Sequence, residues 1–242
     1  QFYLDYIDWL RSSCKTAWGK PVSPKTAHSY YTTLRTALNE AVRENLIASN
    51  PWYRLEMTEK IKVPESKRDF LTIEEIKRMM ATPFFNEQVR QAYLFSCFCG
   101  LRISDIRKLR WRDLSMSGGQ WRASVVMTKT IHPVYIPLSS QAVKWLPERG
   151  DCTPDGLVFG GLPNEGNLCV NLKNWAEKAG VKKNVTFHTA RHSCAVLLLT
   201  LGADIYTVSK ILGHRSVRST QVYAKIVDKK KDDAIALVDN AF

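Results

Sequence analysis

The sequence lacks the features that would place it in a membrane or in an oxidising compartment. No run of about 18 apolar residues is present, so no segment could cross a bilayer as a helix. No signal peptide is recognisable either. The six cysteines have no framework spacing, and Cys97-Phe98-Cys99 lacks the second pair that a zinc site needs. Most stand among apolar residues, which is typical of reduced core cysteines in a cytoplasmic protein.

Acidic residues are too few to balance the basic ones. Lys and Arg number 35 against 23 Asp and Glu, which gives a net charge of +12 and a pI near 9.5. Residues 1–65 hold nine basic and seven acidic residues, whereas residues 66–242 hold 26 and 16. Such an excess indicates a polyanionic partner such as nucleic acid, although a basic protein without one can have the same composition.

The first 62 residues are predicted to form a small helical domain. Apolar side chains recur at helical spacing in residues 2–10 and in residues 26–45, and Ser23 is expected to cap the second helix. The polar face of that helix, which on its own indicates only a solvated surface, carries Lys25, His28, Ser29, Thr32 and Arg35. The charged, aperiodic residues 63–68 are predicted to be an interdomain linker.

Residues 69–242 are predicted to form a second domain, so that the fold class is mainly α with a small antiparallel β-sheet. Residues 121–127 alternate as a strand, residues 134–138 form the return strand, and Lys129 lies in the turn between them. Apolar periodicity predicts helices at 88–99, 105–110, 139–147, 167–179, 188–201 and 205–212, then a short helix with Tyr223 and a last helix at 228–240.

Four side chains with complementary chemistry stand close together near the C-terminus. His188, Arg191, His214 and Tyr223 fall within 36 residues. Transfer of a phosphodiester without a metal needs a nucleophile, cations for the non-bridging oxygens and an acid for the leaving oxygen. Two arginines from different elements could clamp the phosphorus, because a guanidinium bonds two oxygens and stays charged. No cluster of carboxylates suggests a two-metal site instead.

Three motifs in a fixed order resemble the tyrosine recombinase, or phage integrase, family. They are Cys99-Gly100-Leu101-Arg102-Ile103-Ser104-Asp105, His188-Thr189-Ala190-Arg191-His192, and Leu212-Gly213-His214 followed nine residues later by Tyr223. The hairpin with Lys129 lies between the first two motifs, as it does in the family. Each motif alone is common, whereas the ordered set is specific. The resemblance is strong over residues 68–242 and weaker over residues 1–62, which resemble the family's helical core-DNA-binding domain.

The resemblance implies a role for each matched residue. Tyr223 would be the nucleophile that forms a 3′-phosphotyrosyl bond. Arg102 and Arg191 would clamp the phosphate, and Lys129 would protonate the 5′-oxygen that leaves. The rivals for the nucleophile are Tyr206, predicted to be a core residue, and Tyr135 in a strand, and the remote rival for Lys129 is Lys144.

The histidines divide into two groups under the same resemblance. His188 would be a base or a hydrogen-bonding partner near Tyr223, and His214 would donate a hydrogen bond to the scissile phosphate. His192 and His132 are predicted to be structural or surface residues. Asp105 matches a position that is usually acidic in the family and is expected to orient rather than to react.

The implied function is site-specific recombination of double-stranded DNA, with integration or excision of a mobile element or prophage. The resemblance implies a homotetramer that exchanges strands through a Holliday junction, a free protein that is monomeric, and a C-terminal helix in residues 228–242 that packs on a neighbouring subunit. Because the phosphotyrosyl bond stores the energy of the cleaved phosphodiester, neither metal, cofactor nor ATP is expected. The start at Gln1 favours an integrase from which an arm-binding domain is missing. The alternatives are a resolvase of chromosome or plasmid dimers, a non-catalytic DNA-binding relative and a metal-dependent nuclease.

Overall fold

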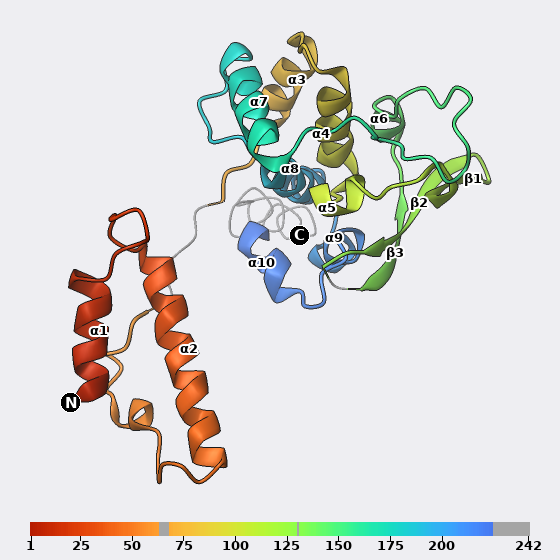
Figure 1. Cartoon of the computed structure of the whole chain (residues 1–242). Helices are drawn as coiled ribbons and strands as arrows, with labels where there is room; N and C mark the ends of the chain where they lie inside the picture. Colours follow the sequence, from red (N-terminus) through yellow and green to blue (C-terminus); the bar gives the residue numbers. More distant parts are fainter. Residues whose placement is uncertain (63–67, 130, 225–242) are drawn as a thin grey trace, which may run out of the picture. The chain divides into compact units, whose positions relative to one another are not determined.

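The computed structural model describes residues 1–62, 68–129 and 131–224, which belong to two compact units, Gln1–Lys67 and Arg68–Phe242 (Figure 1). In these ranges no helix is both long and apolar enough to span a membrane. The helix expected at residues 228–240, and with it the segment 228–242, lies outside them.

The first unit is a pair of helices, α1 (Phe2–Ser12) and α2 (Pro24–Arg43), followed by the short 3-10 helix η1 (Pro51–Arg54). Ser23 caps α2 as predicted, since its Oγ accepts from the Thr26 amide at 3.1 Å. The two helices pack through a small apolar cluster that consists of Tyr3, Ile7, Leu10, Cys14, Ala27 and Tyr31.

The second unit packs its helices around α4 and α8 and carries a small sheet at one side (Figure 1). Its helices are α3 (Ile73–Ala81), α4 (Glu87–Cys99), α5 (Ile103–Ile106), η2 (Trp111–Asp113), α6 (Ser140–Val143), α7 (Glu165–Lys178), α8 (Phe187–Thr200), α9 (Ile205–Ile211) and α10 (Arg218–Ala224). The mainly α class with a small antiparallel sheet is therefore confirmed.

The sheet has three antiparallel strands in the order β1-β2-β3. Strands β2 (Gln120–Met127) and β3 (His132–Pro137) form the predicted hairpin, with Met127 opposite His132 at its end. Strand β1 (Leu114–Ser117) was not predicted, because its four residues include one buried side chain and so show no alternation.

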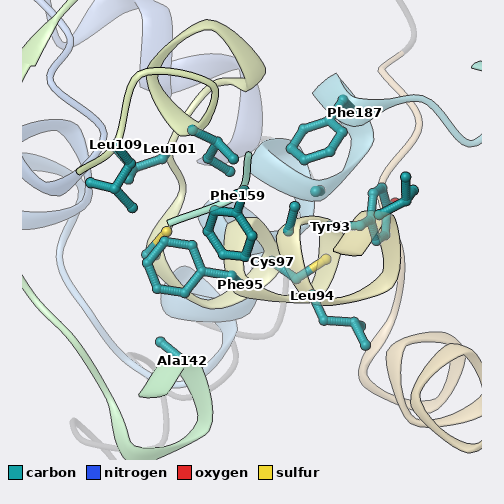
Figure 2. Close-up of a cluster of buried hydrophobic side chains, with 14 of the residues drawn as sticks. Tyr93, Leu94, Phe95, Cys97, Leu101, Leu109, Ala142, Phe159 and Phe187 are labelled. Atoms are coloured by element: carbon teal, nitrogen blue, oxygen red, sulfur yellow. The ribbon is translucent and has the colours of Figure 1, made fainter. Parts of the chain in front are cut away.

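Helix α4 is the centre of the core. Eight of its residues are buried, and six of them are consecutive, from Ala92 to Cys97, so this part of the helix is covered on all sides. Figure 2 shows its side chains against Phe159 and Phe187. The Tyr93 ring lies 5.7 Å from that of Phe187, and the Phe95 ring lies 5.6 Å from that of Phe159. Each such ring stabilises the fold by about 1.5–3 kcal/mol. The Tyr93–Phe187 pair joins α4 to the start of α8, and the Phe95–Phe159 pair joins α4 to the segment before α7.

Two predicted helices are shorter than expected. The helix expected at 105–110 is α5, which begins one residue after Arg102 rather than after Ser104, since the Arg102 carbonyl accepts from the amides of Asp105 and Ile106. The helix expected at 139–147 is α6, which ends at Val143. Beyond it the amides of Trp145 and Leu146 donate to carbonyls three residues earlier, as in a 3-10 turn, and Pro147 ends this turn.

Candidate active site

Arg191 is the buried centre of the candidate site. It lies on α8 and is only 3% exposed. Its Nη1 donates to the Gly100 carbonyl at 2.7 Å, and its Nη2 donates to the Leu212 carbonyl at 2.5 Å. These carbonyls cap α4 and α9, so one side chain connects three helices. A guanidinium has five N–H donors, and donors therefore remain for a ligand.

Burial, and then repulsion from Arg102, lowers the pKa of Arg191 to about 10. The positive charge of Arg102 thus disfavours that of Arg191. An anion beside Arg191 would favour its charge, and a phosphate group offers two oxygens to the planar guanidinium. The site is therefore prepared for a bound phosphate.

Two glycines in the left-handed conformation let the surrounding elements meet. Gly100 has φ +74, and a Cβ there would lie 2.5 Å from Cδ2 of Leu212. Gly213 has φ +61, and a Cβ there would lie 2.9 Å from Cγ2 of Val134 and 3.0 Å from Cε of Met127. The end of α4 thus touches the end of α9, and the loop after α9 touches the hairpin. A side chain at either position would force these elements apart.

Asp105 connects helix α5 to the hairpin. The residue is 1% exposed, and its Oδ1 accepts from the Thr128 amide at 2.8 Å. Because Thr128 directly precedes Lys129, the carboxylate fixes the start of the turn that carries this lysine. Arg102, on the same helix turn, lies with Nη1 3.8 Å from Sδ of Met127 at the end of β2. The geometry gives Asp105 an orienting contact of the kind that the sequence suggested.

His188 lies in the first turn of α8, three residues before Arg191. Partial burial of its ring, and then the charges of Arg191, Arg102 and Lys129, lower its pKa below the ordinary value of 6.5. These three cations come from α8, from the start of α5 and from the hairpin. Arg191 lies about one helical turn after His188 on α8, while Arg102 reaches Met127 at the start of the turn that carries Lys129.

His214 follows the loop glycine and faces α10. Its Nδ1 lies 2.8 Å from Oγ1 of Thr220, a residue of α10 that is fully buried. Burial, and then the charges of Arg191, Arg102 and Arg68, lowers the pKa of His214 to about 4, so the ring is neutral at pH 7. If the threonine hydroxyl donates to Nδ1, the ring proton is on Nε2, which can then donate to a phosphate oxygen.

Tyr223 lies on α10, which packs beside α8 and α9 (Figure 1). The residue is 1% exposed, and its Oη lies 2.5 Å from Nδ1 of His192 and 3.3 Å from Nη1 of Arg68. His192 directly follows Arg191 on α8, so the contact with His192 brings the phenol to the part of α8 that carries Arg191. The nucleophile candidate and the arginines therefore belong to one site.

The structure thus brings together the six residues that the sequence singled out, Arg102, Lys129, His188, Arg191, His214 and Tyr223. Their elements supply a phenol, permanent cations and imidazoles around one place where a phosphate could bind. Within residues 1–62, 68–129 and 131–224, no group of three or more His, Cys, Asp or Glu residues could hold a metal ion.

Two contacts of Tyr223 were missed by the sequence analysis. His192, predicted to be structural or on the surface, contacts the phenol, and its place one helical turn after His188 was the signal that could have indicated this. Arg68 stands 155 residues before Tyr223, and no pattern in the neighbouring sequence indicates that the two residues are in contact.

The expectation that Tyr206 is a core residue was wrong. Its side chain is 68% exposed, because the inward positions of α9 are filled by Val208 and Ser209. Tyr135 on β3 is 72% exposed. Both tyrosines line a cleft between β3 and α9 that reaches His214, whereas Tyr223 is held inside the helical core.

Comparison with known proteins covers both units of the chain. A profile of the phage integrase family matches residues 69–230, and one of the phage integrase SAM-like domain matches residues 1–62. A tyrosine recombinase of Thermosipho africanus is 31% identical over 232 residues, which cover 90% of this chain and 77% of that protein. Tyrosine recombinase XerD of Pseudomonas putida is 27% identical over 241 residues, covering 92% and 76%.

Solved structures show the same fold. XerH site-specific recombinase, in a post-cleavage complex with a palindromic difH substrate, superimposes with a TM-score of 0.73 at 18% identity and covers 98% of this chain and 72% of that one. The integrase of transposon Tn1549, in complex with a circular intermediate DNA, gives a TM-score of 0.70 at 17% identity and covers 91% and 80%.

The helical fold and the site of cations around a tyrosine define a class of enzyme that cleaves and rejoins DNA strands. The chain belongs to the phage integrase family. It is a tyrosine recombinase, and its reaction is site-specific DNA recombination.

Proposed function

We propose that this tyrosine recombinase integrates and excises a mobile element through a 3′-phosphotyrosyl intermediate on Tyr223. The observation that supports the chemistry is a chain of contacts: Oη of Tyr223 lies 2.5 Å from Nδ1 of His192, which directly follows Arg191 on α8. Arg191 in turn bonds the Gly100 carbonyl, two residues before Arg102. The fold shared with a transposon integrase supports the biological role.

The two arginines bind the scissile phosphate of double-stranded DNA first. Arg191 keeps its hydrogen bonds to two backbone carbonyls and binds the phosphate with its remaining N–H donors, while Arg102 approaches the phosphate from the start of α5. Nε2 of His214 donates a further hydrogen bond to a non-bridging oxygen. These contacts strengthen as the pentacoordinate phosphorus gains negative charge, which lowers the barrier.

Strand cleavage then exchanges one phosphodiester for another. Oη of Tyr223 forms a bond to phosphorus, the bond from phosphorus to the 5′-oxygen breaks, and the Lys129 ammonium gives its proton to that oxygen. The phenolic proton passes to a histidine of α8, for which the resemblance offers His188. Attack by the 5′-hydroxyl of a second strand reverses the step and releases Tyr223, so no external energy is consumed.

The two units have separate tasks in this proposal. Residues 1–62 form the core-DNA-binding domain, residues 63–68 the linker, and residues 69–242 the catalytic domain. The division into two compact units and the two separate family matches support this assignment. A homotetramer would hold two duplexes, the free chain being monomeric, and the reaction would take place in the cytoplasm with the DNA. Complexes of XerH and the Tn1549 integrase with DNA support the choice of partner.

A nicked suicide DNA tests the chemistry. The binding site is first selected from random duplexes retained by the protein. It is then nicked, so that the short fragment with the newly formed 5′-hydroxyl diffuses away after cleavage. Wild-type protein should form a denaturation-resistant complex with DNA, also in EDTA, and Tyr223→Phe should form none. Tyr206→Phe is the matched control, because this exposed tyrosine on α9 should be dispensable. A complex that survives Tyr223→Phe, or that needs a metal, would contradict the proposal.

Resolution of chromosome or plasmid dimers is a second candidate, supported by the XerD relative. The two functions differ in the sites that recombine. An integrase should join two unlike sites on separate plasmids, whereas a resolvase should delete DNA between two identical direct repeats. Deletion without intermolecular joining would replace the proposed role by this alternative.

A further inference from the structure

The hydroxyl of Tyr223 has two partners, and both come from outside α10. Nδ1 of His192 lies 2.5 Å from Oη, and Nη1 of Arg68 lies 3.3 Å from it. His188 makes no hydrogen bond to Tyr223 in the part of the chain that the structure covers. Its ring is stacked on that of His192 with the centres 6.3 Å apart, one helical turn further from the phenol.

The two partners fix the direction of the phenolic proton. A guanidinium can only donate, so the bond from Arg68 occupies a lone pair of Oη. The hydroxyl proton is then left for Nδ1 of His192, which must be an unprotonated acceptor. In the neutral ring that tautomer carries its proton on Nε2.

The surroundings keep this imidazole neutral. Burial, followed by the charges of Arg68, His188 and Arg191, lowers the pKa of His192 to about 4. The titratable and charged groups that face it are Arg68 before α3, His188 and Arg191 on α8, His214 before α10, and Tyr223 on α10. A phosphate bound among these cations would add negative charge and raise the proton affinity of the ring.

We infer that His192, rather than His188, is the general base of strand cleavage. As Oη bonds to phosphorus, its proton passes to Nδ1 of His192, which becomes an imidazolium. As the 5′-hydroxyl of the incoming strand attacks the phosphotyrosyl bond, the departing phenolate takes this proton back. Arg68 orients the phenol and stabilises its developing charge. This inference rests on the proposed cleavage by Tyr223.

A base and a mere hydrogen-bonding partner can be separated by His192→Asn. The Asn side chain offers an acceptor near the place of Nδ1 but cannot carry away a proton. His188→Asn is the matched control, since it makes the same change one turn earlier on the same helix. The rate of covalent complex formation with the nicked DNA is measured in a single turnover from pH 6 to pH 8.5. A protein base is needed in this range, because a free phenol ionises only at about pH 10.

Loss of the base should slow cleavage by about 10²–10⁴-fold. The rate of His192→Asn should also rise about tenfold per pH unit, since the phenol must then ionise unaided, while the wild-type rate changes little. His188→Asn should keep the wild-type pH profile. A His192→Asn rate within about threefold of wild type, with a flat profile, would overturn the inference, because general-base catalysis is worth far more.

If the proposed function itself is wrong, the result differs from that of a wrong base. Wild-type protein then forms no covalent complex with DNA, or Tyr223→Phe still forms one. If His192→Asn does not fold, ¹⁵N-histidine spectra of the wild-type protein keep the inference testable. They should show an unprotonated Nδ1 on His192 whose resonance shifts in Tyr223→Phe. A protonated Nδ1, or a resonance that ignores Tyr223→Phe, would contradict it.

Discussion

Gly100→Ala should damage both the fold and the catalytic site, whereas Gly180→Ala should do neither to the same extent. The two glycines share the left-handed backbone after a helix, with φ +74 and φ +69. A Cβ on Gly100 would lie 2.5 Å from Cδ2 of Leu212 and 3.3 Å from Sγ of Cys194. A Cβ on Gly180 would meet nothing within 4 Å. The pair therefore separates backbone strain from close packing.

The magnitudes follow from these contacts. A left-handed alanine costs about 1–2 kcal/mol at either position, and forcing a methyl group into a packed contact adds about 1–3 kcal/mol at Gly100. The Gly100 carbonyl also holds Nη1 of Arg191. A displaced α4 end would misplace this guanidinium, which can slow cleavage by about 100-fold.

Urea denaturation gives the free energy of unfolding, and the nicked DNA gives the cleavage rate. Gly100→Ala should lose about 2–5 kcal/mol in total, and Leu212→Val in the same chain should restore part of it by removing Cδ2. Equal losses in Gly100→Ala and Gly180→Ala, or wild-type cleavage by Gly100→Ala, would refute the view that this contact positions Arg191.

Three further predictions concern charge. The free energy of unfolding should fall as the pH drops from 6.5 to about 4, because His192 and His214 bind protons at a higher pH in the unfolded chain than in the folded one. Urea titrations at neutral and acid pH should show a smaller fall for His214→Asn than for wild type. An equal fall in the two proteins would contradict this. Lys129→Ala should slow cleavage by about 10²–10⁴-fold. It should cleave at the wild-type rate a DNA in which sulfur replaces the bridging 5′-oxygen, since a thiolate leaves without a proton. If sulfur does not restore the rate, Lys129 is not the general acid. The logarithm of the association constant for DNA should fall linearly with the logarithm of salt concentration. Lys25→Ala should reduce the magnitude of this slope by about 0.9, and an association constant independent of salt would exclude a phosphate-binding surface.

Local signals in the sequence were sufficient for the helices that carry the site. Ser23 and Pro24 predicted the start of α2, which is confirmed, and apolar periodicity placed α7 and α8 within two residues of their observed bounds. The glycines in the motifs marked two close approaches, of the end of α4 to the end of α9 and of the loop after α9 to the hairpin. These features depend on neighbours along the chain, which is why one sequence could indicate them.

Contacts between distant segments could not be predicted in the same way. The bonds of Tyr223 to His192 and Arg68 depend on how α10 packs against α8 and on where the chain enters α3. The exposure of Tyr206 depends on which face of the seven-residue helix α9 turns inward, and so short a helix has little periodicity to show it. Tertiary packing decided these cases.

The most direct test of the account is to identify the residue that becomes attached to DNA. Wild-type protein is trapped on the nicked duplex in EDTA, digested with protease and nuclease, and the adduct is located by mass spectrometry. The account predicts one nucleotide joined through its 3′-phosphate to the phenolic oxygen of Tyr223. An adduct on any other residue, or one joined through a 5′-phosphate, would contradict it.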